Sequence, residues 1–134
     1  MTHPSSPPPL VYACSGCSSV AQMANHLALT LDREGVAEMS CIAGVGGGVA
    51  KLVKTARSGR RILAIDGCPL ACARACLRQA GVEPDCHVQL HEYGVRKRYH
   101  ADFDRDEAER ALAQVRDISI ALGGRPAPAH AQAD

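Results

Sequence analysis

Short apolar runs alternate along this chain with longer segments of helical periodicity. Four runs are predicted to be strands: 10–13, 38–42, 61–65 and 87–90. The run at 61–65 (RILAI) is aliphatic after its first residue, as expected of a parallel strand covered on both faces. Four segments are predicted to be helices, beginning near Ser19, Val49, Pro69 and Asp104.

The residues at the starts of these segments support the helix assignments. Ser19 and Gln22 have the spacing of a capping box, in which side chains bond the free amides of the first turn. Asp104 and Glu107 repeat this spacing before the last segment. Pro69 suits the first position of the third helix, because its backbone angle is already helical. Three segments carry one apolar face each: Val20, Met23, Ala24, Leu27, Ala28 and Leu31; Val49, Leu52, Val53 and Ala56; Ala108, Ala111, Leu112, Val115, Ile118 and Leu122.

The alternation of strands and helices predicts βαβ units and a mainly parallel sheet. Right-handed crossovers between parallel strands then give a three-layer α/β/α sandwich of the flavodoxin or Rossmann kind. With about four strands, 2-1-3-4 is the simplest strand order. We therefore expect a single α/β domain over residues 10–122, preceded by a disordered Pro-rich lead-in at 1–9 and followed by a flexible tail at 123–134.

Composition excludes several classes of function. The chain has 134 residues, with 15 Lys and Arg against 14 Asp and Glu, so its net charge of +1 gives no field to attract nucleic acid. It contains no Trp, one Phe and three Tyr, which leaves few rings for stacking bases. No apolar run approaches the roughly 18 residues of a membrane span, and no signal peptide is recognisable. A reducing cytoplasmic location follows as an expectation, in which the seven cysteines serve as metal ligands, redox thiols or core residues.

Several cysteines follow the predicted strands. Cys14 and Cys17 come after the first strand, Cys41 ends the second, and Cys68 comes after the third. Because the carboxyl ends of parallel strands meet at one edge of the sheet, where ligands bind in such folds, these thiols are expected to gather there. Helix N-termini point at the same edge and stabilise thiolates.

Spacing narrows the choice of metal ligands. Cys14 and Cys17 are separated as in zinc knuckles, so both sulfurs can reach one ion. The third helix would carry Cys68, Cys72 and Cys76 on one face, with about 12 Å of helix rise between the first and the last. The favoured tetrad is therefore Cys14, Cys17, Cys68 and Cys72. Cys41 is a substitute fourth ligand, and Cys76 would join only through a cluster, a shifted site or a distorted first turn.

Other residues are weaker candidates. Cys86 follows Pro84 and Asp85 in a predicted loop, and we expect it to take no part in the site. The basic run 96–98 is followed by acidic residues, which favours a solvated face over a phosphate site. The glycine stretch 44–48 resembles a dinucleotide loop, but Val49 stands where the third glycine belongs. A metal-binding role is not expected of the histidines, which are His3, His26, His87, His91, His100 and His130.

Taken together, the motifs resemble those of the DGC protein family, small bacterial and archaeal proteins described as zinc-binding. The resemblance rests on the segment 14–17 (CSGC), on Cys41 before a glycine loop, and on the segment 66–69 (DGCP) followed by Cys72, Cys76 and Leu77. It extends over about residues 10–116. It implies metal binding through these cysteines, with Asp66 and Gly67 shaping the loop, and it supplies no reaction.

The leading hypothesis is a zinc-binding protein. A closed site of four thiolates would be structural, whereas three thiolates with an open position would leave a Lewis acid, with Asp66 nearest for proton transfer. An iron–sulfur or thiol-redox protein using the same cysteines is the alternative. A third possibility is a module in which zinc orders loops for a partner. The sequence does not identify the small molecule or protein partner, and it predicts neither nucleic acid nor membrane binding.

Overall fold

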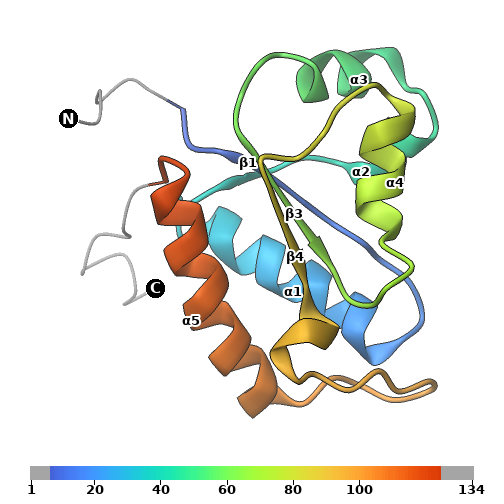
Figure 1. The fold of residues 1–134 in the computed structure, drawn as a ribbon, viewed down its shortest axis with the longest axis vertical. Helices are drawn as coiled ribbons and strands as arrows, with labels where there is room; N and C mark the ends of the chain where they lie inside the picture. Colours follow the sequence, from blue (N-terminus) through green and yellow to red (C-terminus); the bar gives the residue numbers. More distant parts are fainter. Residues whose placement is uncertain (1–6, 125–134) are drawn as a thin grey trace.

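Four strands pair in parallel within one sheet: β1 (Leu10–Ala13), β2 (Glu38–Met39), β3 (Ile62–Asp66) and β4 (Cys86–Gln89). Their order is β2-β1-β3-β4, as the sequence predicts (Figure 1). The computed structural model describes residues 7–124. Most of the predicted lead-in (residues 1–6) and of the predicted tail (residues 125–134) lies outside this range.

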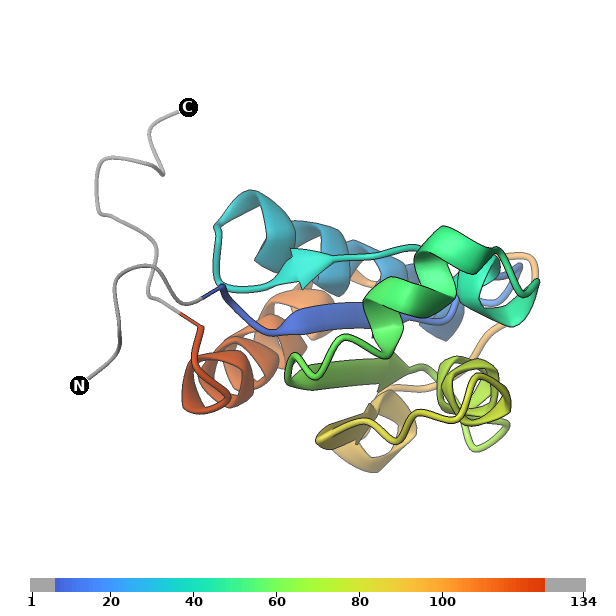
Figure 2. The same cartoon turned by 90° about the horizontal axis from the view of Figure 1, so that it is seen from above.

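Helices cover both faces of the sheet, which makes the molecule a three-layer α/β protein (Figure 2). The helices are α1 (Ser19–Arg33), α2 (Ile42–Gly46), α3 (Ala50–Ala56), α4 (Cys72–Gln79), the short 3₁₀ turn η1 (Leu90–Tyr93) and α5 (Arg105–Ala121). α1 and α5 pack on one face, and α2, α3 and α4 pack on the other.

Successive side chains of the central strands point to opposite faces of the sheet and so contribute to two separate cores. In β1, Val11 and Ala13 point toward α1 and α5, whereas Leu10 and Tyr12 point toward the opposite helices. All four side chains are buried. A strand buried on both faces is continuously apolar, which is why these runs are recognisable in the sequence.

One of the two predicted helix caps is confirmed, and the other lies one residue earlier in the chain. Asp104 accepts a hydrogen bond from the amide of Glu107 at 2.9 Å, as its spacing predicts. At α1 the capping residue is Ser18, one residue earlier than predicted. The Ser19 hydroxyl instead accepts a hydrogen bond from the Arg98 amide at 2.9 Å.

The second strand is shorter than the predicted 38–42, and the glycine stretch is partly helical. The chain leaves the sheet after Met39, and α2 begins at Ile42. At Gly44 a Cβ atom would lie 1.9 Å from Leu52 Cδ1, so the missing side chain lets α2 and α3 pack closely. The glycines here serve helix packing as well as the turn that follows.

The third predicted helix begins at Cys72 and not at Pro69. Residues before it form a turn, in which the Ala71 amide donates to the Cys68 carbonyl at 3.1 Å. Ala71 itself adopts the left-handed region at φ 53°, which interrupts the helix. Cys68 therefore lies outside the helix, and the helix rise does not separate it from the others. No helix among residues 7–124 has the length and apolarity needed to cross a membrane.

Candidate functional site

Two loops and the start of a helix, at the carboxyl edge of the sheet, bring four cysteines to one pocket of about 250 Å³. The loop after β1 carries Cys14 and Cys17, the loop after β3 carries Cys68, and α4 begins with Cys72. These are the four residues that the sequence analysis favours. Cysteines more than 50 residues apart meet here because parallel strands end at a common edge.

Cys14 is, like Cys68, a partly buried cysteine of the pocket. Its Sγ accepts a hydrogen bond from the Gly67 amide at 3.3 Å. Burial raises the pKa of the Cys14 thiol to about 12, and nearby Asp66 adds to the rise while the Gly67 amide opposes it. Without a metal, Cys14 is therefore protonated at neutral pH, and a protonated thiol is a poor nucleophile.

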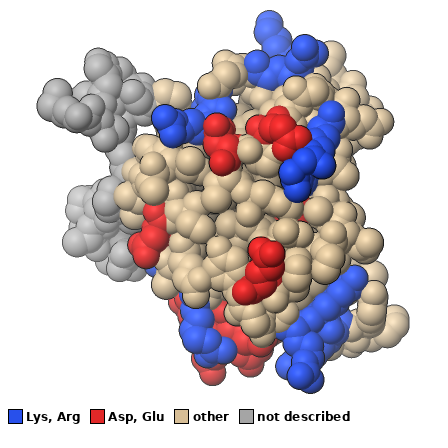
Figure 3. Space-filling model, viewed as in Figure 1, with Lys and Arg blue, Asp and Glu red and all other residues tan. Residues whose placement is uncertain are grey.

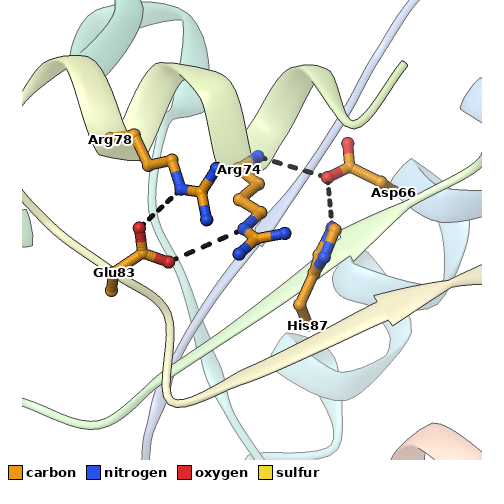
Figure 4. A network of polar contacts seen from close by, with 5 residues as sticks. All are labelled: Asp66, Arg74, Arg78, Glu83 and His87. Carbon is orange, nitrogen blue, oxygen red and sulfur yellow. Dashed lines mark hydrogen bonds and ion pairs between the residues drawn. The ribbon is translucent and has the colours of Figure 1, made fainter. Parts of the chain in front are cut away.

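Asp66, at the end of β3, holds the start of α4 in place (Figure 4). Its carboxylate, 1% exposed, accepts hydrogen bonds from the amides of Ala73 at 2.8 Å and Arg74 at 3.2 Å. His87 of β4 contacts the same carboxylate at 2.8 Å through Nε2. α4 has no capping side chain of its own, because Ala71 stands at that position. Asp66 therefore acts as a distant cap that positions Cys72.

A second polar group joins α4 to the segment that follows it. Glu83 forms ion pairs with Arg74 and Arg78, which extend the network of Figure 4 toward the surface. These side chains are more than one-third exposed, so the pairs contribute little to stability. Only the Asp66 end of the network reaches the cysteine pocket.

The loop after η1 supplies two pocket residues that the sequence analysis missed. Lys97 Nζ donates a hydrogen bond to Cys68 Sγ at 3.6 Å and lies 5.0 Å from the centre of the Tyr99 ring. Its contacts with Tyr99, and secondly with Cys68, raise the pKa of Lys97. The basic run was interpreted as a solvated face, but Lys97 lines the pocket. No local pattern signals this, because the loop reaches the pocket only in the folded chain.

The other three cysteines lie outside the pocket lining. Cys41 precedes α2 and lines a separate hollow of about 390 Å³. Cys76 packs against Gly46, where a Cβ atom would lie 2.8 Å from the Cys76 sulfur. Cys86 is the first residue of β4 and so lies at the opposite edge of the sheet from the pocket. Burial raises the pKa of both Cys76 and Cys86.

The four pocket cysteines fit a thiophilic metal ion by donor type. Thiolate sulfur is a common ligand of Zn²⁺, and two of the four sulfurs already receive N–H hydrogen bonds from the protein. Within residues 7–124, no three His, Cys, Asp or Glu side chains are already spaced as ligands of one ion. Binding would therefore require the cysteine side chains to turn toward a common centre.

Comparison with known proteins identifies the family of this chain and one of its relatives. The family model of the DGC domain matches residues 10–115. Over 122 residues the chain is 56% identical to the anaerobic and virulence modulator AnvM of Pseudomonas aeruginosa, and the match covers 91% of this chain and 92% of that protein. No solved structure was found to match.

The fold and pocket define a small α/β protein with cysteines gathered at the carboxyl edge of its sheet. The chain belongs to the DGC family, as the motifs around its cysteines predict.

Proposed function

We propose that this protein binds a zinc ion through Cys14, Cys17, Cys68 and Cys72. The observation that carries the proposal is that these four thiols, from two distant loops and the start of α4, line a single pocket. All seven cysteines are free thiols in this structure. We place the function in the cytoplasm, where thiols remain reduced and available to a metal.

The surroundings of the sulfurs support this proposal. Four thiolates around Zn²⁺ leave a net charge of −2, which needs hydrogen-bond donors and positive charge nearby. The Gly67 amide and the Lys97 ammonium contact two of the sulfurs. Apolar packing alone would not require hydrogen-bond donors beside these sulfurs.

A binding role fits the site better than a catalytic one. Asp66 is the carboxylate that lines the pocket, and three donors already engage it. It is therefore committed to holding α4 and is poorly placed to exchange protons with a substrate. In this proposal the metal orders the two cysteine loops.

An iron–sulfur cluster on the same cysteines is the second candidate. Four cysteine ligands also suit such clusters. The name of the relative from Pseudomonas aeruginosa, an anaerobic and virulence modulator, favours a chemistry that responds to oxygen. Clusters and low-pKa thiols are both candidates for that, but the protonated state of Cys14 disfavours simple thiol exchange there.

Serine variants test the proposal directly. Cys14→Ser and Cys68→Ser should lose stoichiometric zinc, as measured by competition with a chromophoric chelator under anaerobic, reducing conditions. Cys86→Ser is the matched control, because Cys86 is also half-buried but lies at the other edge of the sheet. It should retain about one zinc per chain. Loss of zinc in Cys86→Ser with full binding in Cys14→Ser would overturn the assignment.

A further inference from the structure

We propose that Lys97 balances the charge of the metal-bound thiolates and thereby sets the affinity of the pocket for its ion. The inference rests on the proposed zinc site. Its basis is the contact between Lys97 Nζ and Cys68 Sγ at 3.6 Å, which joins the loop after η1 to the loop after β3.

Buried anchors hold the Lys97 loop over the pocket. The Ser19 amide donates to the Arg98 carbonyl at 2.9 Å, and the Arg98 amide donates to the Ser19 hydroxyl at 2.9 Å. Ser19 is 3% exposed and begins α1, while Val95 on the other side of Lys97 is 7% exposed. Because its neighbours on both sides are fixed in this way, the backbone at Lys97 is held beside the pocket.

The side chain itself is also oriented. The ammonium lies 5.0 Å from the centre of the Tyr99 ring, a distance at which the ring attracts a cation. Tyr99 lines the same pocket although its side chain is largely exposed. The ring therefore helps to hold the charge beside Cys68.

The chemistry of the site gives this charge a function. A tetrathiolate zinc site carries −2, and one ammonium beside a sulfur offsets half of that charge. Outer contacts to metal ligands commonly change metal affinity by about 10- to 100-fold. Lys97 is only partly buried, so solvent screens it, and we expect the lower end of this range.

Arg96 provides a matched control. It lies one residue away on the same loop, is exposed, and does not line the pocket. Basic side chains gather over this loop at the lower right of Figure 3. Replacing Arg96 or Lys97 with Met removes the same charge from the same region, so only a local contact distinguishes the two variants.

The test compares zinc affinity by chelator competition in the wild type, Lys97→Met, Lys97→Arg and Arg96→Met, together with the thiolate absorbance of the Cd²⁺-loaded proteins. Lys97→Met should bind zinc about tenfold more weakly. Arg96→Met should match the wild type, and Lys97→Arg should recover most of the loss because it keeps the charge. The melting temperatures of the metal-free variants should agree, which separates charge balance from a folding defect.

Each other outcome overturns a different claim. Wild-type protein that binds no zinc refutes the proposed function itself. Equal affinity in the wild type and Lys97→Met refutes only the role of Lys97. Equal weakening in Arg96→Met and Lys97→Met shows a general field in place of a specific contact, and failure of Lys97→Arg to restore affinity excludes charge as the cause.

Discussion

The amide nitrogen of Gly67 lies 3.3 Å from Cys14 Sγ and donates a hydrogen bond to it. This bond joins the loop after β3 to the loop after β1, which together carry three of the four pocket cysteines. The approach is possible because residue 67 has no side chain: a Cβ atom there would lie 2.6 Å from the backbone carbon and oxygen of Val20. The glycine is thus a requirement of the site's geometry.

Replacing Gly67 with Ala should therefore destabilise the protein. The added methyl group meets backbone, which cannot move aside as a flexible side chain can, and we expect a loss of about 1–3 kcal/mol in the free energy of unfolding. Urea denaturation of the metal-free protein measures it. Gly16→Ala is the control, since its Cβ would lie 3.8 Å from the nearest atom, an ordinary contact. Equal stability of the two variants would contradict the close approach.

Asp66→Ala should lower stability by about 3 kcal/mol, because it leaves the amides of Ala73 and Arg74 without acceptors and removes the partner of His87. The loss is measurable by urea denaturation without metal. Glu83→Ala, which removes the exposed ion pairs of the same helix, should cause no measurable change. The distant-cap interpretation is wrong if the two variants are equally stable.

Ala71→Gly should stabilise the metal-free protein. Ala71 adopts φ 53° and ψ 50°, a region that disfavours a residue with a Cβ atom by about 1–2 kcal/mol and that glycine accepts freely. The greater entropy of glycine in the unfolded chain offsets part of this, so a gain of up to about 1 kcal/mol is expected. Ala75→Gly, at an exposed position inside α4, should instead cost about 1 kcal/mol. A loss of stability in both variants would show that residue 71 is not strained.

Thiol alkylation should distinguish Cys14 from Cys17 in the metal-free protein. With its pKa raised by burial to about 12, Cys14 is a thiolate at pH 8 in only about one molecule in 10⁴. Iodoacetamide should therefore modify exposed Cys17 first, as followed by peptide mass spectrometry. Reaction at Cys14 should speed up as pH rises toward 12. Similar rates at pH 8 would contradict the burial of Cys14.

The raised pKa of Cys14 also makes the free energy of unfolding depend on pH in the alkaline range. The folded state holds the Cys14 proton more tightly than the unfolded state, whose thiol has the ordinary pKa of 9.0. The stability contributed by the neutral thiol is complete below pH 9 and is lost as pH rises from 9 to about 12. The free energy of unfolding should fall less steeply in this range for Cys14→Ser than for the wild type.

The sheet and the main cysteine cluster are predictable from the sequence because they depend on local patterns. Apolar runs reveal the buried strands, and parallel pairing then places Cys14 and Cys68 at one edge. The start of α4 is not predictable in this way, since it depends on left-handed Ala71 and on capping by Asp66 from another strand. The position of Lys97 is likewise not predictable from local sequence, because contacts of its loop with α1 bring it to the pocket.

The central claim is most directly tested by metal analysis of the protein purified without oxygen and without metal-affinity chromatography, alongside its visible spectrum. The account predicts about one zinc per chain and no colour. Iron together with the visible absorbance of iron bound to sulfide would show that the same cysteines hold an iron–sulfur cluster and not zinc. Protein without metal and with all seven thiols free would contradict the metal site.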